Sequence, residues 1–103
     1  MDNVGEMEKK LEEVLQEAID IHGKGEIKKA ETLYKFILEI EPNHPHANHN
    51  LGIITLSLKK PEEALIFFHK ALKSKPEIKQ FWLSYIKTLL KEKKYSKAKK
   101  IIA

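Results

Sequence analysis

Apolar side chains recur along the chain every three or four residues, the spacing that places them on one face of an α-helix. The first such segment runs from Met7 to about Gly23. The same spacing predicts four further helices over residues 26–41, 45–59, 61–75 and 78–93. A sixth is expected to begin near Tyr95 and is still running at Ala103. No segment alternates apolar and polar residues as a half-buried strand does, so we expect an all-α fold.

Glycine and proline mark where these helices end. The two glycines of Gly23–Gly25 disfavour continued helix, and Pro42 pushes the residue before it out of the helical region. Asn43 or His44 is the expected N-cap of the third helix, with Pro45 in its first turn. The links are short, so consecutive helices are expected to form antiparallel pairs.

A longer period of 34 residues is superimposed on the helical one. Similar residues recur 34 positions apart in three sets: Ala30, Ala64 and Ala98; Tyr34, Phe68 and Ile102; and Pro42 and Pro76. A fixed period of this length is typical of a repeat array rather than of one globular core. We therefore expect a single domain over residues 1–103, with repeats at about 11–44, 45–78 and 79–103, the last of them truncated.

At these residues the chain resembles the tetratricopeptide repeat (TPR) family. That pattern has Trp, Leu-Gly and Tyr in the first helix of a pair, then Ala, an aromatic residue, Ala and Pro. The middle repeat matches through Leu51, Gly52, Ala64, Phe68, Ala71 and Pro76. It departs at Asn48, in the Trp position, and at Thr55, in the Tyr position, whereas the third repeat keeps Trp82. The resemblance implies a right-handed α–α superhelix of stacked antiparallel helix pairs, six helices in about 2.5 TPR units. It also implies that small residues such as Ala18 and Gly52 lie where paired helices approach closely.

In the TPR family the first helix of each pair lines a concave groove, so the resemblance implies a module that binds a protein or peptide there. The expected groove residues are Leu15, Gln16, Ile19, His46, His49, Asn50, Ile53, Leu83, Ser84 and Lys87. The position shared by Gln16, Asn50 and Ser84 is polar in every repeat. In superhelical relatives an asparagine ladder in this position binds peptide backbone, a task that suits a carboxamide because it both donates and accepts. The alternative is a solvated polar row.

The array also resembles repeats at the front of larger bacterial proteins, among them glycosyl-, sulfo- and methyltransferases. The runs that carry this likeness are residues 43–48 and 81–86. The alternative function is therefore an N-terminal, substrate-presenting portion of such a transferase. Because the chain stops at Ala103 within the expected sixth helix, we expect a truncated piece that self-associates through that unfinished helix.

Composition and charge exclude several kinds of functional site and partner. The chain of 103 residues has a net charge of +4 and no cysteine, which removes disulfides, thiolate metal sites and cysteine nucleophiles. Residues 1–44 carry a net charge of −5 and residues 45–103 one of +9. All basic residues are lysine, and the lysine-rich end could attract phosphates. The chain has no arginine to make bidentate contacts with phosphate, and its first half is acidic. We therefore expect no nucleic-acid partner.

Residues that could carry chemistry are few. His44, His46 and His49 lie close together, but no cysteine or acidic neighbour completes a metal shell, so we expect no metal. No serine has a nucleophile-elbow context and no glycine loop follows a strand, so we expect no enzyme activity and no cofactor. The acidic start lacks a signal-peptide core, and no run of apolar residues reaches membrane-spanning length. A cytoplasmic protein that binds proteins and not membranes is expected.

Overall fold

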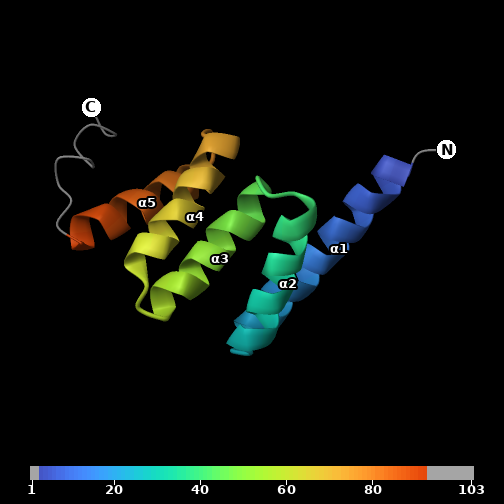
Figure 1. Cartoon of the computed structure of the whole chain (residues 1–103), viewed down its shortest axis with the longest axis horizontal. Helices are drawn as coiled ribbons and strands as arrows, with labels where there is room; N and C mark the ends of the chain where they lie inside the picture. The colour runs from blue at the N-terminus through green and yellow to red at the C-terminus, as the bar shows by residue number, and fades with distance from the viewer. Residues whose placement is uncertain (1–2, 93–103) are drawn as a thin grey trace.

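The computed structural model describes residues 3–92, which form five α-helices joined by short turns (Figure 1). The helices are α1 (Asn3–Gly23), α2 (Ile27–Ile40), α3 (Pro45–Ser57), α4 (Pro61–Ser74) and α5 (Lys79–Lys91). Their bounds agree with those expected from the apolar periodicity, except that α1 begins before Met7. Its first turn carries Glu6, and an acidic side chain there is favourable beside the positive end of the helix dipole. The expected sixth helix lies outside the described residues.

The helices stack side by side in chain order, α1 at one end and α5 at the other (Figure 1). Each packs mainly against the helix before it and the helix after it. The pairs are α1 with α2 and α3 with α4, and α5 packs against α4. The fold is therefore the all-helical α–α superhelix of stacked antiparallel pairs, in which stability is shared between pairs and their neighbours.

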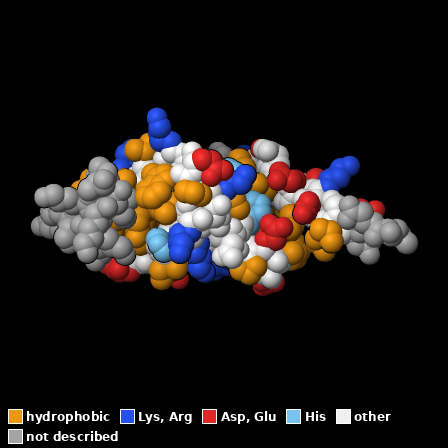
Figure 2. Space-filling view, turned by 90° about the horizontal axis from the view of Figure 1, so that it is seen from above, with side chains coloured by type: hydrophobic (Ala, Val, Ile, Leu, Met, Phe, Trp, Pro, Cys, Tyr) orange, Lys and Arg blue, Asp and Glu red, His pale blue; other side chains and the backbone are white. Residues whose placement is uncertain are grey.

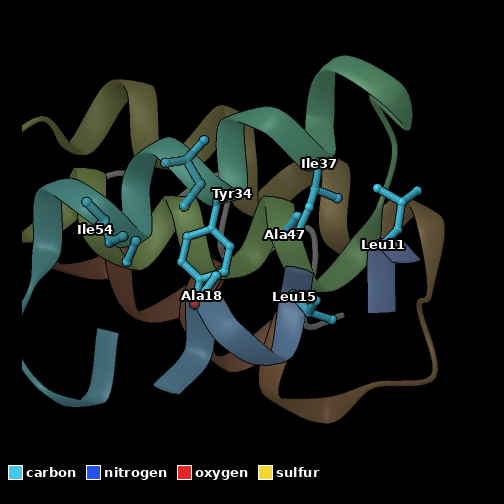
Figure 3. Packing of buried hydrophobic residues seen from close by; sticks show 9 residues of the cluster. Leu11, Leu15, Ala18, Tyr34, Ile37, Ala47 and Ile54 are labelled. Carbon is cyan, nitrogen blue, oxygen red and sulfur yellow. The ribbon is translucent and has the colours of Figure 1, made fainter. Parts of the chain in front are cut away.

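Small residues allow the helices of each pair to approach closely, as the family resemblance implies. Ala18, Ala30 and Ala64 are fully buried. In the first pair the ring of Tyr34 points from α2 toward Ala18 of α1 (Figure 3). In the second pair the corresponding contact joins Phe68 and Gly52: a Cβ added at Gly52 would lie 2.5 Å from Cε1 of Phe68. The backbone of α3 thus lies directly against an aromatic ring of α4.

The buried side chains form two clusters. The first joins α1, α2 and α3 and includes Leu11, Tyr34, Ile37 and Ile54; the second joins α4 and α5. In the second, Phe68 packs with Phe81 and Tyr85. Phe81 and Tyr85 are nearly inaccessible. Trp82, which holds the Trp position of the TPR pattern, is only half-buried.

A hydrogen bond from the first helix of one pair to the end of the previous pair recurs with the 34-residue period. At the α2–α3 junction, Nδ2 of Asn48 donates to the carbonyl of Pro42 over 3.0 Å. At the α4–α5 junction, Nε1 of Trp82 donates to the carbonyl of Pro76 over 2.6 Å. We call this bond the junction clasp. The departure of Asn48 from the TPR pattern therefore changes the donor and keeps the bond.

The turns within the pairs share a left-handed residue at equivalent positions. Gly25 has φ of 84° after α1, and Lys59 has φ of 63° after α3. This conformation is strain-free for glycine but brings the Cβ of other L-residues close to the following carbonyl oxygen. The second turn thus requires a backbone geometry to which lysine is poorly suited.

The contact between Gly52 and Phe68 predicts that Gly52→Ala destabilises the protein. Overpacking costs typically about 1–3 kcal/mol, while alanine regains up to about 1 kcal/mol of helix propensity, so we expect a net loss of about 1 kcal/mol. Urea unfolding followed by circular dichroism measures it. Gly23→Ala is the control, because nothing lies within 4 Å of a Cβ there. Wild-type stability of Gly52→Ala would contradict the close approach.

The left-handed turn predicts that Lys59→Gly stabilises the protein by about 1 kcal/mol, because the substitution removes the Cβ clash. Thermal unfolding provides the measurement. Lys24 lies in the equivalent turn after α1 without a positive φ, so Lys24→Gly is the matched control and is expected to lower the melting temperature. A melting temperature reduced equally by both substitutions would show that residue 59 is unstrained.

Candidate functional site

The first helices α1, α3 and α5 carry the residues expected to bind a ligand, and we call their shared exposed surface the first-helix face. Its most distinctive feature is apolar. Four large apolar side chains are exposed to solvent there: Ile19 by 40%, Ile53 by 36%, Leu83 by 40% and Leu90 by 41%. Ile19 and Ile53 occupy the same position of successive repeats. On α5 this position holds Lys87, and Leu83 and Leu90 lie four residues before it and three residues after it, on the same side of the helix. Each of the three helices therefore exposes apolar side chains here, and we call these four side chains the apolar row.

Charge varies along the same direction. Toward the N-terminal end of the stack the face carries Glu12 and Asp20, and at the α5 end it carries Lys87 and Lys91. A view from above likewise has most acidic side chains on the N-terminal half and an apolar patch nearer the C-terminal end (Figure 2). A ligand lying across the helices therefore meets an acidic end and a basic end with apolar contacts between.

The structure places the expected site residues in three environments. Gln16, Ile19, His46, Ile53, Leu83 and Lys87 are exposed, Asn50 is half-buried, and Leu15, His49 and Ser84 are buried. Leu15 belongs to the first core cluster. Gln16 donates from Nε2 to the carboxylate of Asp20 over 3.1 Å on the surface of α1. As ligand contacts, these ten residues remain predictions.

His49 and Ser84 connect α3 to α5. Nε2 of His49 lies 2.7 Å from Oγ of Ser84, and both side chains are buried. The imidazole also packs against the rings of Phe81, at 4.8 Å between centroids, and Phe68, at 5.5 Å. We call this contact the His49 bridge. Sequence reasoning placed both residues in the groove but did not pair them; their positions are one residue out of phase in adjacent repeats.

A second polar contact joins the first two pairs. The hydroxyl of Tyr34, which is fully buried, lies 3.4 Å from Nδ1 of His22 on α1 and is hydrogen-bonded by the side chain of Asn50 on α3. Burial raises the pKa of Tyr34, and the Asn50 bond opposes that rise. Oδ1 of Asn50 also lies 3.4 Å from Nδ1 of His49. Asn50 therefore connects Tyr34 to the His49 bridge, and its carboxamide is partly engaged within the protein.

The contacts from Ser84 to His49 and from His49 to Asn50 follow the order of the nucleophile, base and orienting group of a catalytic triad. The surroundings do not support catalysis. Ser84 lies in the middle of α5, where main-chain N–H groups are used by the helix, so they offer no oxyanion hole at Ser84. Its Oγ also accepts from Nε2 of Gln80 over 3.4 Å. The arrangement is suited to holding helices together.

The other histidines have separate roles. Nδ1 of His44 accepts from the backbone N–H of Ala47 over 3.1 Å, which makes His44 the N-cap of α3, as expected. The ring of His46 lies edge-on to Phe81, with centroids 5.4 Å apart. Within residues 3–92, no three His, Cys, Asp or Glu side chains gather as a metal site would require. In the same stretch no helix is long and apolar enough to cross a bilayer.

Comparisons with known proteins support the fold. No protein-family model matches the sequence, and no curated protein matches it. A chain of the solved structure of Naa15/Naa10 bound to HypK-THB matches with a TM-score of 0.71 and 24% identity over 81% of this chain. This chain spans 12% of the length of that one. The likeness establishes a TPR-like helical repeat fold.

The His49 bridge predicts that stability falls in mild acid. Burial lowers the pKa of His49, so the unfolded chain, with an ordinary histidine pKa of about 6.5, binds the proton more readily than the folded one. The stabilisation is complete above that pH and is lost as pH falls toward the lower folded pKa. Burial also lowers the pKa of His44, so His44 contributes to the same loss of stability in acid. Melting temperatures between pH 7.5 and 5.0 measure the effect.

His49→Gln keeps a side chain that can bond Ser84 but removes the titrating group, so it is expected to flatten this pH dependence, leaving the part due to His44. His22→Gln is the control and should keep the wild-type profile, because His22 is not among the groups that shift the pKa of His49 or of His44. An unchanged profile in His49→Gln would show that the bridge is not coupled to protonation.

Proposed function

We propose that the chain is a non-catalytic protein-interaction module that binds an extended peptide segment across α1, α3 and α5. The observation that carries this proposal is the exposed apolar row of the first-helix face, Ile19, Ile53, Leu83 and Leu90. Burying large apolar side chains is the main favourable term in most protein association. The segment would place apolar side chains against this row.

The polar contacts beneath the row support the same function. The His49 bridge holds α3 to α5, and Asn50 with Tyr34 holds α3 to the first pair. These contacts fix the relative positions of the exposed apolar residues before a ligand arrives. A preorganised surface loses less conformational freedom on binding than one that must be ordered by the ligand.

The charge variation along the face specifies an orientation. A segment with basic residues at one end and acidic residues at the other would place the basic end near Glu12 and Asp20 and the acidic end near Lys87 and Lys91. These exposed charges contribute more to orientation and association rate than to affinity. A helical chain of the same fold occurs in the assembly of Naa15/Naa10 with HypK-THB, which is consistent with an interaction role.

Peptides selected from a phage-displayed random library against the wild-type chain provide the test. We expect their affinity, measured by fluorescence anisotropy, to fall at least about tenfold for Ile53→Asp, because an acid replaces a central apolar contact. Phe36→Asp is the matched control: Phe36 is an exposed apolar residue on α2, outside the first-helix face, and its variant should bind as the wild type does.

Ile53 is preferred to His49 or Asn50 for this test, since loss of either polar residue would disturb the fold as well as the face. Circular dichroism confirms that both variants remain folded. Failure to enrich any peptide, or equal affinity for the wild type and Ile53→Asp, would contradict the proposed function.

A further inference from the structure

The middle helix of the first-helix face has no charged side chain. α3 contains no Asp, Glu, Lys or Arg, although these residues make up 33% of the whole chain. Apart from its histidines, the side chains that α3 exposes cannot be charged, and they include the apolar Ile53. A helix surface that faces solvent ordinarily carries charged residues, whereas the centre of a protein interface is depleted of them. The exposed side of α3 therefore has the composition of a surface that another molecule covers.

The two outer helices of the face carry opposite charges. α1 has six acidic residues and two lysines, whereas α5 has three lysines and no acidic residue. On the face itself Glu12 and Asp20 of α1 are exposed, and so are Lys87 and Lys91 of α5. The face is thus negative on α1, uncharged on α3 and positive on α5.

This order of charge is complementary to itself. Consecutive helices alternate in direction, so α1, α3 and α5 run the same way (Figure 1). A second copy turned by 180° about an axis parallel to α3 can therefore meet the first with α3 opposite α3 and α1 opposite α5. Each negative helix then faces a positive one, and Ile53 faces Ile53 of the other copy. A two-fold interface of this kind joins the same surface of both copies.

We propose that two copies of this chain pair through their first-helix faces about a two-fold axis parallel to α3. The pairing covers the apolar row of each copy and brings the acidic residues of α1 to the lysines of α5. It rests on the same row as the proposed peptide binding and regulates it, because a peptide reaches the row only when the copies separate. Opposite charges at the two edges fix the orientation of the pair more than they add to its affinity.

Sedimentation equilibrium of the whole chain, up to millimolar concentration, tests the pairing. We expect a reversible monomer–dimer equilibrium that Ile53→Asp weakens at least about tenfold, because two carboxylates then meet at the centre of the interface. Monomeric protein at every concentration would overturn the proposal. So would a dimer that Ile53→Asp leaves unchanged, since that result indicates end-to-end association of α5 with α1.

Exchanging charges between copies tests the orientation. One variant carries Lys87→Glu with Lys91→Glu, and the other carries Glu12→Lys with Asp20→Lys. Each variant alone opposes like charges and should pair at least about tenfold more weakly than the wild type, whereas an equimolar mixture should pair again as a mixed dimer. Failure of the mixture to pair would overturn the proposal.

Lys70→Glu with Lys73→Glu is the matched control for this exchange. Both lysines are exposed on α4, outside the first-helix face, and the net charge changes by the same amount as in the α5 variant. This control should pair as the wild type does, and circular dichroism confirms that all variants are folded. Equal weakening by the control would show that net charge, and not the face, governs the association.

Peptides selected against the chain separate this inference from the proposed function. A selected peptide should dissociate the dimer, and a dimer that binds peptide without dissociating would overturn the pairing through this face. Peptide binding by a chain that never pairs would contradict the pairing alone. Pairing by a chain that enriches no peptide would contradict the proposed function alone.

Discussion

The close approach of two helices within each pair is the constraint on which the structure depends. Phe68 occupies the space that a side chain at residue 52 would need, and Tyr34 lies over Ala18 in the same way. Interiors packed this tightly tolerate little change in volume. Since each helix contacts mainly its neighbours in the chain, an error in one pair is not absorbed by a distant part of a common core. The small residues therefore determine whether the pairs form, and the pairs determine whether the first helices share a face.

Much of this architecture could be predicted because it follows from the regular spacing of residues along the sequence. The apolar spacing predicts five helices that the structure contains, and the 34-residue period predicts the positions of Ala30, Ala64 and Gly52 at close contacts. The N-cap at His44 also follows from local sequence, because the cap and its proline are adjacent. These features depend on residues a few positions apart.

The features that could not be predicted depend on atoms from different repeats. The burial of His49 requires the rings of Phe68 and Phe81, which come from two other helices, and nothing in the local pattern distinguishes it from exposed His46. The left-handed backbone at Lys59 could not be predicted from the local sequence either, because lysine does not favour that conformation. Its position 34 residues after Gly25 is the signal that indicates it. The polar row was expected to be available to a ligand throughout, whereas Ser84 and, in part, Asn50 are bonded within the protein.

The clasp donors differ in reach, and this difference has a geometric consequence. In an asparagine the donor nitrogen is closer to the main chain than it is in a tryptophan, while the two bonds to the proline carbonyls are both short. The Pro42 carbonyl must accordingly approach the axis of its helix more closely than the Pro76 carbonyl approaches that of its own. The reach of the donor side chain therefore sets how closely the end of one pair is held to the first helix of the next.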